Sequence, residues 1–125
     1  MLASLPMETG EAREAEDIER TVRIPGAGRL EEGWARKVRY PDPETGATCE
    51  LVLCRVDGVL YALDTHCPHE GGRLNDGPLE AGRYAVCPLH LYKFDPRDGS
   101  AVEVECDPAR TLPVREVGAD AEIDV

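Results

Sequence analysis

The residues with the clearest chemical potential are two cysteines and two histidines in two short clusters. The first cluster reads Cys-Pro-His at 67–69 and the second reads Cys-Pro-Leu-His at 87–90, with seventeen residues between them. Thiolate and neutral imidazole are both good ligands for transition metals. The pattern therefore predicts one metal centre shared by two loops, and its candidate ligands are Cys67, His69, Cys87 and His90.

The mixture of ligand types separates two kinds of metal centre. In a [2Fe–2S] centre with two cysteines on one iron and two histidines on the other, the imidazoles remove negative charge and raise the reduction potential. Structural zinc also accepts two cysteines and two histidines, but zinc fingers usually group like ligands together. Here each cluster combines one cysteine with one histidine. The pattern favours iron–sulfur chemistry, and a zinc-stabilised interaction module stays open as an alternative.

The sequence around both clusters resembles the Rieske ferredoxin family. The matching text is DTHCPHEGG at 64–72 and CPLHLYKFD at 87–95, followed by Asp98-Gly99, and with flanking strands the likeness covers roughly residues 20–125. The resemblance implies one [2Fe–2S] cluster per chain. It places Cys67 and Cys87 on the inner iron and the two histidines on the outer iron.

Some positions near the clusters differ from other branches of that family. Respiratory members carry a disulfide-forming cysteine in each loop, where this chain has Gly72 and Leu89. Tyr92 replaces a serine that hydrogen-bonds a bridging sulfide in those members, and Leu91 stands where many members have glycine. Fewer hydrogen bonds to sulfur lower the potential. The resemblance therefore indicates the low-potential, disulfide-free branch, and it extends to Rieske-like small subunits of assimilatory nitrite reductases.

Short strands between turns are expected to position the two clusters. Alternating or apolar runs predict strands at 21–24, 35–40, 50–56, 59–63, 83–86, 91–94, 100–105, 112–117 and 121–125. Asp57-Gly58 suits the positive φ angles of a two-residue hairpin turn. The pattern predicts an all-β fold, an antiparallel β sandwich or barrel with an inserted cluster-binding subdomain at about 64–95, and the resemblance implies that this fold is of the Rieske type. Both clusters then lie at strand ends.

The length and composition of the chain predict a single domain. Residues 1–17 are acidic and lack an apolar face, so we expect a disordered extension there and the Rieske domain at 18–125. No apolar run reaches the length that spans a bilayer, and the N-terminus lacks a secretory signal pattern. A cytoplasmic protein is the simplest expectation.

The formal net charge of −11 disfavours two classes of partner, nucleic acids and anionic membranes. It suits brief docking with redox proteins, because charged surfaces steer association. Four cations near the clusters make that end less acidic than the rest in this expectation, which leaves the sign of the docking surface open; they are Arg73, Arg83, Lys93 and Arg97.

The remaining cysteines and the third histidine are not expected to bind the metal. Cys49, Cys54 and Cys106 are predicted to be buried free thiols, with a Cys54–Cys106 disulfide as the alternative. His66 precedes Cys67 directly and is interpreted as a loop residue, although it could influence the centre through the surrounding shell.

The functional hypothesis is a one-electron carrier that passes electrons from a reductase to an oxygenase or another redox enzyme. The chain is too short to hold a separate catalytic domain with a 2-His-1-carboxylate iron. An electron-transfer protein, or a redox-enzyme subunit such as that of nitrite reductase, is therefore favoured over an enzyme with its own substrate site.

Overall fold

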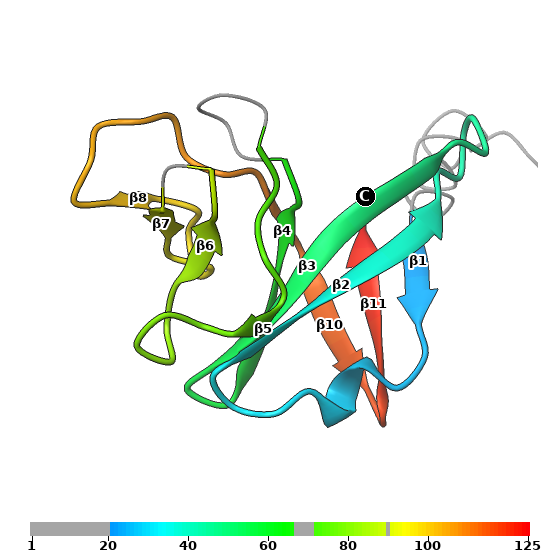
Figure 1. Cartoon of the computed structure of the whole chain (residues 1–125). Helices are drawn as coiled ribbons and strands as arrows, with labels where there is room; N and C mark the ends of the chain where they lie inside the picture. The colour runs from blue at the N-terminus through cyan, green and yellow to red at the C-terminus, as the bar shows by residue number, and fades with distance from the viewer. Residues whose placement is uncertain (1–20, 67–71, 90) are drawn as a thin grey trace, which may run out of the picture.

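The fold is built from antiparallel strands in three sheets (Figure 1). The computed structural model describes residues 21–66, 72–89 and 91–125. In chain order the elements are β1 (Thr21–Ile24), the 3-10 turn η1 (Ala27–Arg29), β2 (Trp34–Pro41), β3 (Thr48–Val56), β4 (Val59–Asp64), β5 (Gly77–Pro78), β6 (Ala85–Cys87), β7 (Tyr92–Phe94), β8 (Ala101–Val102), β9 (Thr111–Leu112), β10 (Val114–Val117) and β11 (Asp120–Asp124). The sheet orders are β1-β11-β10, β5-β2-β3-β4-β9 and β6-β7-β8. The predicted all-β class is confirmed.

Strand β3 is buried on both faces and separates two apolar cores. Leu51 and Leu53 pack on one side, in a core that includes residues of β1 and β11. Val52 and Cys54 pack on the other side, in a core that includes residues of β6 and β7. Successive side chains of a strand point to opposite faces, which explains the alternation. In Figure 1, β3 accordingly runs between β1 and β11 on one side and the small β6-β7-β8 sheet on the other.

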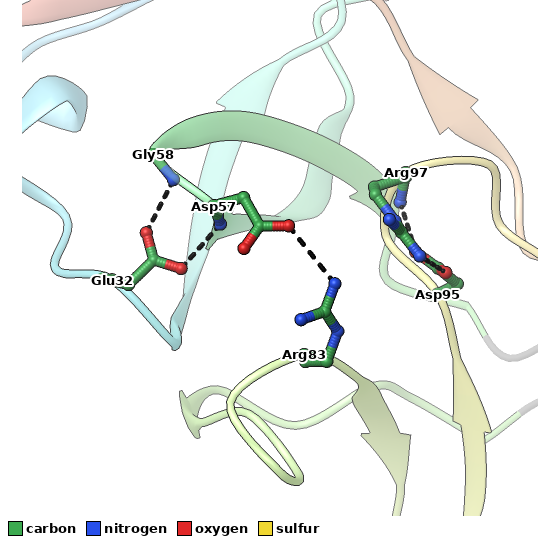
Figure 2. Close-up of polar contacts among 6 residues, drawn as sticks. All are labelled: Glu32, Asp57, Gly58, Arg83, Asp95 and Arg97. Atoms are coloured by element: carbon green, nitrogen blue, oxygen red, sulfur yellow. Dashed lines mark hydrogen bonds and ion pairs between the residues drawn. The ribbon is translucent and has the colours of Figure 1, made fainter.

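The hairpin between β3 and β4 has the predicted two-residue turn. Asp57 and Gly58 have φ angles of 52° and 79°, and Val56 pairs with Val59. Both turn N–H groups donate to the Glu32 carboxylate, at 2.6 and 2.7 Å (Figure 2). The carboxylate of Asp57 also forms an ion pair at 3.2 Å with the guanidinium of Arg83, which lies just before β6 (Figure 2). The hairpin tip therefore also contacts the segment that leads into the small sheet.

Several short elements differ from the sequence-based expectations. The strand predicted at 100–105 is limited to β8, and the backbone turns to a φ of 69° at Glu103. The strand predicted at 112–117 is divided at Pro113, which cannot donate a ladder hydrogen bond. The turn η1 and the two-residue β5, which pairs with the start of β2, were not predicted. The small sheet continues past residue 95, because β8 pairs with β7.

The three cysteines outside the predicted ligand set are free thiols, as predicted. Burial raises the pKa of Cys54 to about 12, so this thiol is inert as a nucleophile. Cys49 and Cys106 are half-buried, whereas the sequence predicted buried thiols. The extension predicted at 1–17 lies outside the described residues. Within the described part of the chain, no helix is long and apolar enough to cross a membrane.

The chain leaves β7 through the predicted turn at 95–99, which is closed by a carboxylate. The Asp95 carboxylate accepts hydrogen bonds from the Arg97 backbone N–H at 2.9 Å and from its guanidinium at 2.7 Å (Figure 2). The Gly99 N–H donates to the Asp95 carbonyl oxygen at 2.7 Å. The side-chain hydrogen bond from Arg97 lowers the pKa of Asp95.

Replacing Asp95 with asparagine should lower the free energy of unfolding at pH 7 by about 1 kcal/mol, since Arg97 is half-exposed and screened by solvent. Because the pKa of Asp95 is lower in the folded state, its ionised carboxylate stabilises the fold at pH values above the unfolded-state pKa of about 3.9. This stabilisation is lost as the pH falls through the folded-state pKa. The difference between wild type and variant should therefore begin to narrow below about pH 5. Urea unfolding at a series of pH values measures this difference.

The matched control is Asp107→Asn. Asp107 is exposed, and no hydrogen bond or ion pair of its side chain is found among the described residues. Its replacement should leave stability unchanged within about 0.5 kcal/mol. A pH-independent loss in Asp95→Asn would show that the carboxylate charge is not what stabilises the turn.

Candidate metal centre

One of the four predicted ligands can be placed directly. Cys87 is the last residue of β6 and its side chain is fully buried. Cys67, His69 and His90 lie outside the described residues. The geometry of the centre is therefore built from Cys87 and from the segments that lead into and out of the first loop (residues 67–72) and the second loop (residues 88–91).

The first loop is closed at its base by two antiparallel contacts. After β4 ends, the Thr65 carbonyl oxygen accepts a hydrogen bond from the Leu74 N–H at 2.8 Å. His66 and Arg73 form an isolated antiparallel bridge directly above that contact. The chain thus enters and leaves the first loop through adjacent antiparallel segments, and both predicted ligands of this loop fall between these segments in the sequence.

The second loop connects two paired strands. Cys87 at the end of β6 pairs with Tyr92 at the start of β7. Leu91 has a φ of 60°, a conformation that favours glycine and costs a leucine about 1–2 kcal/mol. The resemblance implies glycine at this position in many family members. The backbone conformation of Leu91 is one that glycine adopts more easily than leucine.

The two loops meet at Gly72 and Cys87. The bases are joined by a hydrogen bond from the Asn75 N–H to the Val86 carbonyl oxygen at 2.8 Å. A Cβ atom on Gly72 would lie 2.6 Å from the Cys87 sulfur, closer than van der Waals contact allows. Gly72, which follows the first pair of predicted ligands in the sequence, therefore lies against Cys87, the first predicted ligand of the second pair.

The disulfide positions of the respiratory branch are also adjacent here. A Cβ atom built on Gly72 would lie 3.3 Å from the Leu89 Cβ atom, and the Cβ atoms of a disulfide are about 3.5–4.5 Å apart. The resemblance places Gly72 and Leu89 at the positions of the two disulfide-forming cysteines, and their proximity agrees with that placement. In this chain the same contact is made by a glycine and an apolar side chain.

A network of charged side chains holds the strands beneath the first loop. The Asp64 carboxylate accepts hydrogen bonds from the His66 backbone N–H at 3.0 Å and contacts its ring Nδ1 at 2.9 Å. Arg110 lies 3.6 Å from the other Asp64 oxygen, and Arg73 pairs with Glu50 at 3.2 Å. The contact with Asp64 fits the interpretation of His66 as a loop residue.

Sequence analysis missed two residues of the site. Gly72 was noted only for the cysteine that it replaces, although its lack of a Cβ atom permits the contact with Cys87. Thr65 is fully buried, and its hydroxyl oxygen has no hydrogen-bond partner among the described residues. The signal for Thr65 was a polar residue directly between an apolar strand and a ligand cluster, but burial could not be read from that position.

The surroundings fit a [2Fe–2S] centre with cysteines inside and histidines outside. On the inner side, Cys87 and Thr65 are 0% exposed. On the outer side, the neighbours of the predicted ligand His90 are open to solvent, with Leu89 50% and Leu91 71% exposed. Cys87 is therefore shielded from water, whereas the described residues on both sides of position 90 are exposed.

Replacing Gly72 with alanine should impair assembly of the centre. The added methyl group must displace either the Cys87 sulfur or the backbone of the first loop, at a cost of about 1–3 kcal/mol. We expect less iron per chain and weaker visible absorption, measured by metal analysis and spectroscopy.

Gly118→Ala is the control for Gly72→Ala. A methyl group at Gly118 meets no atom within 4 Å, although its φ of 61° makes alanine mildly unfavourable there. This variant should keep its full iron content. A Gly72→Ala protein with normal iron content would show that the two loops are not in close contact when the centre is assembled.

Comparison with known proteins agrees with this geometry. The family model of the Rieske [2Fe-2S] domain matches residues 23–116. The ferredoxin subunit of 3-phenylpropionate/cinnamic acid dioxygenase from Photorhabdus laumondii is 36% identical over 86 residues, which cover 68% of this chain and 75% of that protein. The ferredoxin component of the naphthalene 1,2-dioxygenase system from Pseudomonas aeruginosa is 41% identical over 80 residues, which cover 61% of this chain and 73% of that protein.

A solved structure shows the same architecture. The ferredoxin of carbazole 1,9a-dioxygenase from Nocardioides aromaticivorans IC177 superposes with a TM-score of 0.64 and 26% sequence identity, over 82% of this chain and 95% of that one. The match of the family model over most of the chain, the identity to ferredoxin subunits and the shared architecture agree with one another. The chain belongs to the Rieske [2Fe-2S] domain family.

Proposed function

We propose that this protein is a one-electron carrier that receives electrons from a reductase and delivers them to an oxygenase. Its family cofactor, one [2Fe–2S] cluster per chain, supplies reversible one-electron chemistry. Both relatives described above are ferredoxin parts of dioxygenase systems. This favours an oxygenase as the electron acceptor over the nitrite reductase alternative, and an iron–sulfur centre over a structural zinc site.

The ligands that we propose are Cys67 and Cys87 for the inner iron and His69 and His90 for the outer iron. The observation that carries this assignment is the position of Gly72, where a Cβ atom would lie 2.6 Å from the Cys87 sulfur. It shows that the first loop ends against the buried cysteine of the second loop. Two loops that meet there can present all four side chains to one centre.

The protein around the centre has two tasks, to exclude water from the cysteines and to expose the histidines to a partner. The burial of Cys87 supports the first task. The exposed side chains of Leu89 and Leu91 support the second, because they flank the proposed outer ligand His90. An electron can then enter and leave through the outer side with little protein in between.

The charges near the two loops are compensated within the protein. Each of the four cations expected to make this end less acidic has a carboxylate within 4.0 Å; the pairs are Arg73–Glu50, Arg83–Asp57, Lys93–Glu103 and Arg97–Asp95. Paired surface charges contribute little field of their own. We therefore propose that the apolar contact through Leu89 and Leu91, rather than a local charge excess, makes the docking surface.

The division of the chain follows from the same proposal. We assign the Rieske domain to residues 18–125, with its cluster-binding part at about 64–95, and we place the extension at 1–17 outside it. The family match at residues 23–116 supports the domain assignment. We also propose a cytoplasmic location, supported by the free thiols of Cys49, Cys54 and Cys106, which suit a reducing compartment.

The ligand assignment is tested by electron paramagnetic resonance of the dithionite-reduced protein with iron and zinc analysis. Wild type should show a rhombic signal and two irons per chain.

Cys87→Ser should lose the cluster, and His90→Cys should retain some cluster at a lower potential, because a thiolate adds negative charge. Cys106→Ser is the control, since Cys106 is a half-buried free thiol, and it should keep the signal. Unchanged colour in Cys87→Ser would refute the assignment.

The docking surface is tested by Leu91→Asn. Asparagine tolerates the φ of 60° at this position but removes the apolar contact. Electron transfer to an oxygenase should become several-fold slower, equivalent to about 1 kcal/mol of lost interaction, at an unchanged reduction potential. Stopped-flow oxidation of the reduced protein measures the rate. Val117→Asn, a similarly apolar-to-polar change at an exposed position on β10, should leave it unchanged. Equal rates for both variants would place docking elsewhere.

A further inference from the structure

Thr65 has a buried hydroxyl group that no interaction among the described residues accounts for. Its side chain is 0% exposed, and Oγ1 has no hydrogen-bond partner in the part of the chain that the structure describes. Nearly all buried polar side-chain atoms in proteins have a hydrogen-bond partner, which can be a water molecule, an ion or a bound group. Among the described residues, Oγ1 of Thr65 is the one buried side-chain oxygen or nitrogen atom that lacks a hydrogen-bond partner.

The hydroxyl lies at the base of the first loop, on the side of the sheet that holds the metal centre. Thr65 directly follows β4, and its backbone pairs with Leu74 at 2.8 Å. Alternate residues along a strand share a face, so Thr65 continues the face of Leu63. Leu63 and Leu74 pack in the same apolar core as Cys87. The face that Thr65 shares is therefore the one that packs against the buried cysteine.

The cross-strand neighbours of Thr65 lead to the same place. Leu74 lies opposite Thr65, and Gly72 is two residues further along that strand, toward the loop. Gly72 has the contact with the Cys87 sulfur described above. Thr65 is thus one step below the point where the two loops meet, and it is two residues before the proposed ligand Cys67.

We propose that the Thr65 hydroxyl donates a hydrogen bond to a sulfur atom of the metal centre and thereby raises its reduction potential. This inference rests on the proposed function. Anionic sulfur atoms accept hydrogen bonds, and such bonds are one of the factors that set the potential of iron–sulfur centres. Thr65 is a positioning residue in this proposal and not a ligand. It supplies a hydroxyl donor from the base of the first loop.

The test compares Thr65→Val, which removes the hydroxyl at nearly constant shape, with Thr65→Ser, which keeps it. The reduction potential is measured by an electron paramagnetic resonance titration of the loaded full-length protein. The valine variant should shift the equilibrium constant for reduction toward the oxidised form by up to tenfold, about 59 mV for a one-electron couple. The serine variant should restore most of the wild-type value.

A second readout follows the proton of the hydrogen bond. Resonance Raman iron–sulfur frequencies of the wild-type protein should shift between H2O and D2O, because the hydroxyl proton exchanges. Part of this shift should disappear in Thr65→Val and remain in Thr65→Ser. The control Thr48→Val makes the same chemical change at an exposed position on β3 and should alter neither the potential nor the frequency shift.

The outcomes separate this inference from the proposed function. A wild-type protein without the rhombic signal would overturn the proposed function itself. A fully loaded Thr65→Val protein with wild-type potential and wild-type deuterium shift would overturn only the role of Thr65, and it would indicate a hydroxyl that bonds to backbone instead. If the valine variant does not load, Thr65→Ala against Thr65→Ser gives the same comparison, and equal potentials of that pair would also refute the proposal.

Discussion

The structure depends on one strand that is buried on both faces. Because β3 alternates its side chains between two cores, it joins the sheet of β1, β11 and β10 to the part of the chain that holds the metal centre. The buried Cys87 belongs to the second of these cores. Its position is therefore fixed by the same apolar packing that holds β3. The β3–β4 hairpin then delivers the chain directly to the first loop.

Backbone hydrogen bonds close the two loops at their bases. The contacts between Thr65 and Leu74 and between Asn75 and Val86 tie three neighbouring segments together by backbone hydrogen bonds of 2.8 Å. Gly72, at the end of the first loop, lies directly against Cys87. These contacts restrict the segments that carry Gly72 and Cys87, and restricted movement around the centre suits an electron carrier.

The sequence predicted features that depend on local patterns and missed those that depend on distant contacts. Asp57-Gly58 predicted its hairpin because the φ angles of such a turn are a local property. The apolar run of β3 predicted a buried strand, but not that its faces belong to two different cores. The ligand motif predicted the centre, and the structure places Cys87 at the buried end of β6, while the assignment of Cys67, His69, Cys87 and His90 as ligands stays a prediction. The importance of Gly72 and Thr65 arises from packing between the loops, which periodicity does not encode.

The two loops carry different parts of the proposed function. The first loop is held by buried and charged contacts around Asp64 and Thr65, on the dry side of the centre, where hydrogen bonds to sulfur set the potential. The second loop exposes Leu89 and Leu91, and the cations around it are neutralised by their own carboxylates. Changes on the exposed face can then alter partner recognition without altering the potential, and changes beneath the first loop can do the reverse. This separation follows from the difference in burial between the two segments, since Cys87 and Thr65 are buried whereas Leu89 and Leu91 are exposed.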